Sequence, residues 1–228
     1  MILGEDRLKN KLVYGVGIND ADYKIYIREE LPRTNGKRNR KIVWRCPFYS
    51  RWTHMLKRCF SKAEKLRSPT YKDVTCCEEW LTFSNFKSWM ETQDWEGKEL
   101  DKDLLVYENK IYSPETCVFI ERRLNMFLVK SNKTRGIYPI GVSYYTDPRL
   151  ISPLKHPYRA TINNRDKNVT LGYYLTPMSA HRAWQKAKIK QAQDLAASQT
   201  DERVIKGLQR VADKIQYDLD NNLETKDF

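Results

Sequence analysis

Hydrophobic residues at helical spacing predict amphipathic helices in the first half of the chain. After Ser50, whose hydroxyl suits a helix N-cap, apolar side chains recur at i, i+3, i+4, i+7 and i+8, and aromatic side chains repeat similarly over about residues 79–92. The first stripe consists of Trp52, Met55, Leu56, Cys59 and Phe60, and the second of Trp80, Phe83, Phe86, Trp89 and Met90. Both stripes are interpreted as core.

Two more helices are predicted toward the C-terminus. One has Thr176 as its N-cap and Pro177 in its first turn, and it runs to about Ala197. The other spans 201–219, and its apolar face consists of Val204, Leu208, Val211, Ile215 and Leu219. This face needs a partner surface, which the chain itself or a second copy, in a homodimer, could provide.

Short apolar runs predict strands between these helices. One or two strands are expected within 12–27, followed by a basic loop over 32–40. Residues 100–128 predict a compact ββα unit. Its parts are a strand over 104–106, a turn over 108–110, a strand over 117–120 and a helix over 121–129.

A three-stranded sheet is predicted after a basic linker over 131–136. Its strands are 140–145, 158–163 and 169–173. The expected class is α+β: N-terminal helices and the ββα unit, then a three-stranded antiparallel sheet packed on a helix, then a C-terminal helix. The expected regions are 1–130, 137–197 and 198–228.

Composition narrows the class of protein. No apolar run approaches the roughly 20 residues that cross a bilayer, and the N-terminus lacks the apolar core of a signal peptide. We therefore expect a cytoplasmic protein with no membrane partner. The five cysteines are an odd number without paired zinc-ligand spacing, so they are interpreted as thiols and zinc is not expected.

The net charge of +12 is distributed in three blocks. Residues 33–67 hold twelve Lys or Arg and one acid, residues 78–103 hold eight acids and three Lys, and residues 122–167 hold ten Lys or Arg and two acids. Basic blocks interleaved with aromatic residues favour a nucleic-acid partner, although a solvated basic surface has the same composition. The candidate DNA-contacting residues in these blocks are Arg38, Arg40, Arg51, Arg58, Lys133 and Arg135.

The segment 141–188 resembles the Apetala-type, ethylene-response-factor-like DNA-binding domain. The likeness is carried by Gly141-Val142, by Arg159-Ala160-x-Ile162, by Leu171-Gly172-Tyr173 and by Ala180-x-x-Ala183-Trp184. In that family a three-stranded sheet on one helix enters the major groove of double-stranded DNA. The residues that the resemblance implies as DNA contacts are Tyr144, Tyr145, Arg159, Arg165 and Lys167. The insertion 147–157 departs from the family pattern.

The preceding segment is similar to phage HNH (His-Me finger) homing endonucleases. The matching residues are Trp52-x-x-Met55-Leu56-x-Arg58-Cys59, Trp80-x-x-Phe83-x-x-Phe86, Leu100-Asp101-Lys102-Asp103, Tyr112-x-Pro114-x-x-Cys117 and Asn125. The resemblance implies Asp101 and Asn125 as ligands of Mg²⁺ or Mn²⁺, with Asp103 beside them. Lys102 stands where the family has its general-base histidine.

Two functions follow from this pattern. One is a metal-dependent DNA endonuclease, with Lys102 and Asp103 in the catalytic positions, in a phage-infected or bacterial host cell. The other is a sequence-specific, repressor-like DNA-binding protein of homing-endonuclease descent that retained DNA binding and lost the catalytic general base. A protonated lysine cannot accept a proton from water, which favours the binder, whereas the retained Asp101 and Asn125 favour the nuclease. A role in protein interaction, with the charge directed at an acidic partner, is a third alternative.

Overall fold

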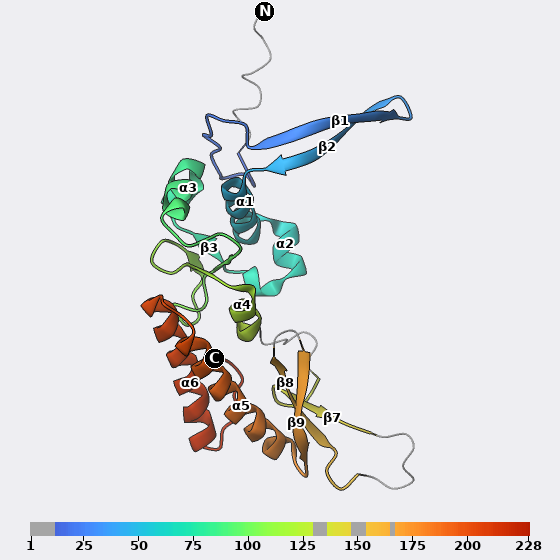
Figure 1. Cartoon of the computed structure of the whole chain (residues 1–228), viewed down its shortest axis with the longest axis vertical. Helices are drawn as coiled ribbons and strands as arrows, with labels where there is room; N and C mark the ends of the chain where they lie inside the picture. Colours follow the sequence, from blue (N-terminus) through green and yellow to red (C-terminus); the bar gives the residue numbers. More distant parts are fainter. Residues whose placement is uncertain (1–11, 130–135, 147–153, 165–166) are drawn as a thin grey trace, which may run out of the picture. The chain divides into compact units, whose positions relative to one another are not determined.

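The computed structural model describes residues 12–129, 136–146, 154–164 and 167–228, which form two units (Figure 1). The first unit contains the residues up to Asp103 together with Glu108–Phe119, and the second contains Leu104–Tyr107 together with Ile120–Phe228. Both units combine helices and strands, which confirms the expected mixture of α and β structure. No helix among the described residues is long and apolar enough to cross a membrane.

The first unit is built around short helices and small sheets. Its helical elements are α1 (Pro47–Phe60), α2 (Lys62–Arg67), η1 (Pro69–Tyr71), η2 (Glu78–Leu81) and α3 (Phe83–Glu91). Its strands are β1 (Tyr26–Thr34), β2 (Lys37–Arg45), β3 (Thr75–Cys76), β4 (Glu99–Asp101), β5 (Ile111–Tyr112) and β6 (Val118–Ile120). β1 pairs with β2, β3 pairs in parallel with β5, and β4 pairs with β6.

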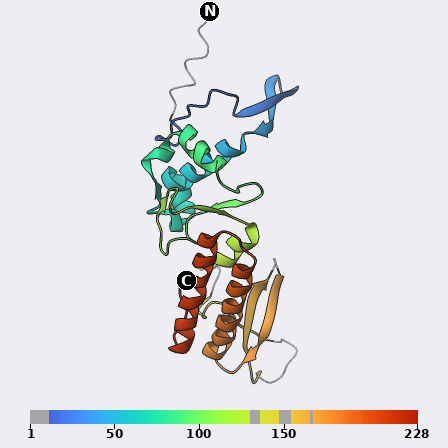
Figure 2. The same ribbon diagram turned by 60° about the vertical axis from the view of Figure 1, so that its left-hand side comes forward.

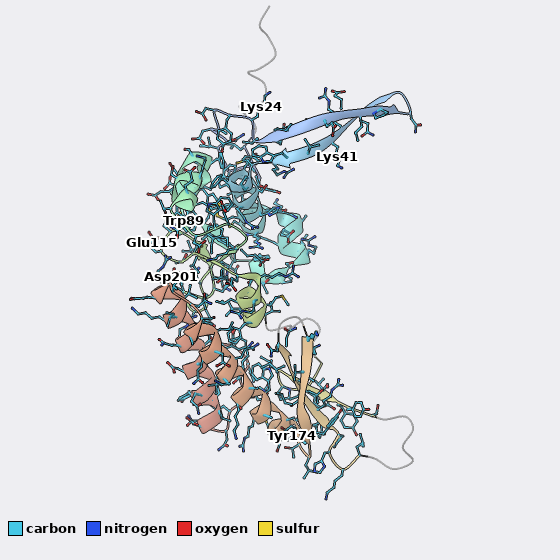
Figure 3. All side chains as sticks on the ribbon, viewed as in Figure 1. Lys24, Lys41, Trp89, Glu115, Tyr174 and Asp201 are labelled. Atoms are coloured by element: carbon cyan, nitrogen blue, oxygen red, sulfur yellow. The ribbon has the colours of Figure 1, made fainter. Side chains whose placement is uncertain are left out.

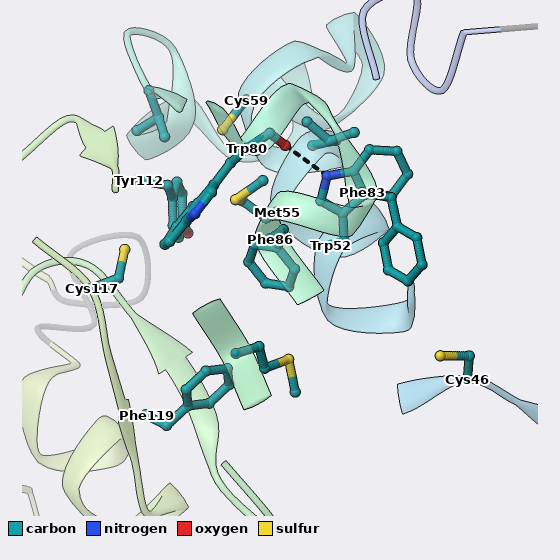
Figure 4. Close-up of a cluster of buried hydrophobic side chains, with 13 residues drawn as sticks. Cys46, Trp52, Met55, Cys59, Trp80, Phe83, Phe86, Tyr112, Cys117 and Phe119 are labelled. Carbon is teal, nitrogen blue, oxygen red and sulfur yellow. Dashed lines mark hydrogen bonds between the residues drawn. The ribbon is translucent and has the colours of Figure 1, made fainter. Parts of the chain in front are cut away.

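Aromatic side chains form the core of this unit (Figure 4). Four residues of the predicted α1 stripe, Trp52, Met55, Leu56 and Cys59, are buried, and the fifth, Phe60, is partly buried against the same core. The Trp52 indole N–H donates to the carbonyl oxygen of Trp80 at 2.7 Å, which satisfies the one polar atom of the largest core side chain. The core thus fixes α1 against the segment that leads into α3.

The predicted basic loop over 32–40 is wrong. These residues belong to a β-hairpin, in which β1 and β2 run antiparallel and the chain turns at Asn35 and Gly36. Both turn residues have positive φ, 52° and 72°, as two-residue hairpin turns of the Asn-Gly type require. The Asn-Gly dipeptide is the sequence feature that predicts this hairpin. It was overlooked because the many charged residues around it are typical of a loop.

Three other expectations change in detail. α1 begins three residues before Ser50, at Pro47, and the helix expected over 79–92 is divided into η2 and α3. Within 12–25 only isolated bridges form among the described residues, so the expected early strands are absent there.

The strand expected over 104–106 is also wrong, since this segment is a series of bends after β4. Three short strands, β4, β5 and β6, precede α4 (Arg122–Leu128), so the expected ββα unit is not confirmed. The likeness of this segment to an HNH module stays a prediction.

The second unit confirms the predicted three-stranded antiparallel sheet and C-terminal helices. Its strands are β7 (Val142–Tyr144), β8 (Tyr158–Asn164) and β9 (Lys167–Tyr174), and its long helices are α5 (Pro177–Ala197) and α6 (Glu202–Asp220). α5 lies between the sheet and α6 (Figure 2). The apolar stripe of α6 is buried in this unit except for Leu219, which is partly buried, and α5 supplies the partner surface that the stripe needs.

Two contacts fix α5 against the segment before β7. Gly141 has φ of 78°, and a Cβ there would lie 2.1 Å from the Trp184 ring, so only glycine allows this approach. Beside it, buried His181 contacts the Ile140 carbonyl oxygen through Nδ1 at 2.9 Å. Its Nε2 accepts from the Thr225 backbone N–H at 3.0 Å, which joins the C-terminal segment to the same helix.

Candidate nucleic-acid interface

The outer face of the β7–β8–β9 sheet, opposite α5, is the strongest candidate site. Side chains alternate between the two faces of a strand, and Ala160 and Ile162 of β8 are buried on the side that contacts α5. Arg159, Thr161 and Asn163 therefore project from the other side.

Arg159 lies at the centre of a cross-strand row on this face. Ser143 of β7 and Tyr173 of β9 are its register partners. The Arg159 Nε donates to Ser143 Oγ at 3.3 Å, and the guanidinium carbon lies 5.6 Å from the centre of the Tyr145 ring. Tyr145 in turn packs against Tyr173, with ring centres 5.3 Å apart. The neighbours thus orient the guanidinium, which has five N–H donors and uses one on Ser143.

Tyr144 does not join this row. It stands in register with Tyr158, one residue from Arg159 on β8, and so belongs to the opposite face. There it packs edge-on against Tyr158 with ring centres 5.5 Å apart. Sequence reasoning missed Tyr173, although the Leu-Gly-Tyr strand was recognised, because cross-strand register is not visible in a single sequence.

The other candidates of the second unit divide into two groups. Lys167 is exposed at the start of β9, opposite Asn164. Lys133, Arg135 and Arg165 lie outside the described residues.

Two candidate arginines of the first unit make internal contacts. Arg51 donates to the Lys98 carbonyl oxygen at 2.7 Å. Arg58 donates to the Tyr112 hydroxyl at 3.2 Å and lies over the Tyr71 ring, 5.5 Å from its centre. These contacts connect α1 to the rest of its unit, so both arginines have structural roles.

The two candidate arginines of the hairpin lie on β2. Arg40 is exposed and pairs with Glu30 across the hairpin at 2.7 Å. Arg38 lies two residues before it on the same strand.

The segment from Asp101 to Asn109 holds the candidate catalytic residues in a hydrogen-bonded loop. The buried Lys102 ammonium donates to the Asp103 carboxylate and to the Asn109 carbonyl oxygen, the latter at 3.0 Å. Asp101 Oδ1 accepts the Asp103 backbone N–H at 2.9 Å. The Asn109 side chain donates to the carbonyl oxygens of Lys102 and Ile111, both at 2.7 Å.

The expected metal ligands, Asp101 and Asn125, stay a prediction. A cation at Asp103 would have to displace the Lys102 ammonium, and a lysine that donates two hydrogen bonds offers no lone pair to activate water. Asn125 lies on α4 in the second unit, where it is partly buried. No group of three or more His, Cys, Asp or Glu side chains in the described part of the chain could hold a metal ion.

Comparison of the chain with protein-family models, curated proteins and solved structures finds no match.

Proposed function

We propose that this protein binds double-stranded DNA through the outer face of the β7–β8–β9 sheet. The observation that carries the proposal is Arg159, which Ser143 and Tyr145 hold on the sheet face opposite α5, a face that no described helix of its unit covers. A pre-oriented guanidinium suits bidentate contact with a phosphate or with the O6 and N7 atoms of guanine. The resemblance of this segment to the Apetala-type domain agrees with that use of the sheet.

The composition of the face favours reading of base edges in addition to phosphate contact. Thr161, Asn163 and Asn168 add hydrogen-bonding side chains beside Arg159, and Asn163 and Asn168 are register partners. Hydroxyl and amide groups donate and accept, as base edges in the major groove require. Lys167 adds a charge at the end of the same sheet, where it would contact a phosphate.

We propose binding without cleavage, as in a repressor-like regulator, because the candidate catalytic residues are engaged in holding a loop. Lys102 and Asp103 bond to each other, and Lys102 also bonds to Asn109. The descent from a homing endonuclease that the sequence resemblance implies is compatible with this use, since the DNA-binding sheet does not depend on these residues.

The test compares duplex binding by the native protein, Arg159→Gln and the control Lys190→Gln, which removes the same charge from an exposed position on α5. Affinity is measured by fluorescence anisotropy on a labelled 30-base-pair duplex selected by the native protein from random DNA. Loss of a bidentate contact is worth about 1–3 kcal/mol, so Arg159→Gln should weaken binding about five- to 150-fold. Equal affinities for the two variants would refute the assignment.

A further inference from the structure

The β1–β2 hairpin is a ribbon that packs little against the other described elements of its unit. From Arg28 to Lys41 its described side chains are exposed or only partly buried, and no helix in the described part of the unit packs closely against this stretch (Figure 1). An isolated two-stranded ribbon is marginally stable and contributes nothing to a core. Stabilisation of the fold therefore does not explain why the protein has this ribbon.

Charge is the feature that the ribbon adds to the protein. Residues 26–45 contain seven Lys or Arg and two acids, a net +5 out of the total of +12. Both acids stand opposite a base in the register, Glu29 opposite Lys41 and Glu30 opposite Arg40. Arg28 and Arg45 stand instead opposite Ile42 and Tyr26, so the excess positive charge remains on the ribbon.

The basic side chains occupy both faces. Paired residues share a face and successive residues alternate, so Arg28 and Arg40 project from one side and Lys41 from the other. Lys41 is labelled on the ribbon in Figure 3. The Arg28 guanidinium lies 4.4 Å from the centre of the Tyr26 ring, which holds it along the strand. A polyanion on only one side of the ribbon would leave half of this charge unused.

We propose that the β1–β2 ribbon is a second DNA-contacting element that lies in the major groove, where phosphates flank it on both sides. The inference rests on the proposed DNA-binding function and extends it from one element to two. Two strands about 4.8 Å apart fit a groove about 12 Å wide, and nine residues per strand extend about 30 Å. Linking two binding elements raises overall affinity because the second contact becomes intramolecular.

The test uses a ribbon variant, Arg28→Gln/Lys41→Gln/Arg45→Gln, and a control that removes three charges from the second unit, Lys186→Gln/Lys190→Gln/Lys206→Gln. Both keep the Arg40–Glu30 ion pair. Affinity for a labelled 30-base-pair duplex of mixed sequence is measured between 0.05 and 0.3 M NaCl. Loss of three phosphate contacts should make the slope of log affinity against log salt about 2–3 less negative, and should weaken binding at least tenfold near 0.1 M salt.

A second duplex tests the groove. It has the same sequence, with glucosylated 5-hydroxymethylcytosine in place of cytosine, so that bulky groups fill the major groove. The ratio of native to ribbon-variant affinity should fall toward one on this duplex. An unchanged ratio would place the ribbon outside the groove and overturn that part of the proposal.

The outcomes separate this inference from the proposed function. If the native protein binds duplex DNA and the ribbon variant binds like the control, the inference fails and the function stands. If the native protein shows no salt-dependent binding to duplex DNA, the proposed function itself fails. Arg28→Lys/Arg45→Lys should retain the native affinity, because the positive charge is kept. Thermal unfolding of every variant checks that a loss of affinity is not caused by misfolding.

Discussion

At the scale of single residues, the basic side chains of this protein fall into two groups according to the residues that they contact. Arg159 and Arg58 both belong to basic segments. Arg159 is held on the sheet face opposite α5, whereas Arg58 lies against Tyr112 and Tyr71. The sequence predicted the charge of both and could not predict this division, because contacts between residues 54 positions apart leave no local pattern. Lys102 was likewise singled out for chemistry, and its ammonium donates hydrogen bonds to Asp103 and to the Asn109 carbonyl oxygen.

Gly141 gives a prediction about stability. Gly141→Ala combines positive φ with overlap against Trp184, and these should together lower the free energy of unfolding by about 2–4 kcal/mol. Gly97→Ala is the matched control, since Gly97 has φ of 71° and no atom within 4 Å of a Cβ. It should cost only the backbone strain, about 1–2 kcal/mol. Urea unfolding of both variants checks the difference, and equal losses would contradict the close approach of the Trp184 ring.

Lys188 gives a prediction about pH. Burial lowers the pKa of this lysine to about 7, while its ammonium lies 3.7 Å from the centre of the Phe127 ring. Between pH 7 and the ordinary lysine pKa of about 10.4, the unfolded chain binds a proton that the folded chain does not, so stability rises with pH in this window.

The check is the difference in unfolding free energy between the native protein and Lys188→Met from pH 7 to pH 9. The native protein should gain on the variant by up to about 1.4 kcal/mol per pH unit. A difference that stays constant across this range would show that Lys188 titrates alike in the folded and unfolded chain.

At the scale of elements, the regular periodic segments were predictable and the irregular ones were not. The helix from Pro177 to Ala197 agrees with its predicted cap and length, because the Thr176 side chain accepts the Ser179 backbone N–H as its sequence suggests. The ribbon was missed because its strands carry charge on both faces and so lack the alternation that marks a half-buried strand. The bends over 104–106 were wrongly predicted as a strand, because three consecutive apolar residues are also typical of a buried strand.

The loop from Asp101 to Asn109 gives a prediction at this scale. Asp101→Ala and the native protein should leave supercoiled plasmid equally intact in Mg²⁺ or Mn²⁺, because Lys102 donates hydrogen bonds and does not accept a proton. Asn109→Ala should lower the free energy of unfolding by about 1–3 kcal/mol, since buried backbone carbonyls lose their donors. Plasmid nicking that depends on the metal and disappears with Asp101→Ala would contradict the structural role.

At the scale of the whole molecule, the charged residues of the chain belong to segments with different structural surroundings. The strongly basic stretch 33–67 is divided between the ribbon and internal contacts of α1, and the acidic stretch 78–103 ends in the loop that Lys102 holds. The sequence predicted a nucleic-acid partner from the net charge. Only the arrangement of β1 and β2 and of the β7–β8–β9 sheet distinguishes the surfaces that would make the contact.

The most direct test of the central claim is the affinity of the native protein for duplex DNA as a function of salt. If Arg159, Lys167 and the ribbon residues Arg28, Lys41 and Arg45 each contact a phosphate, log affinity should fall against log salt with a slope of about −4 to −5. A single strand of the same sequence should bind more weakly. A slope near zero, or equal affinity for the single strand, would contradict binding of double-stranded DNA through these surfaces.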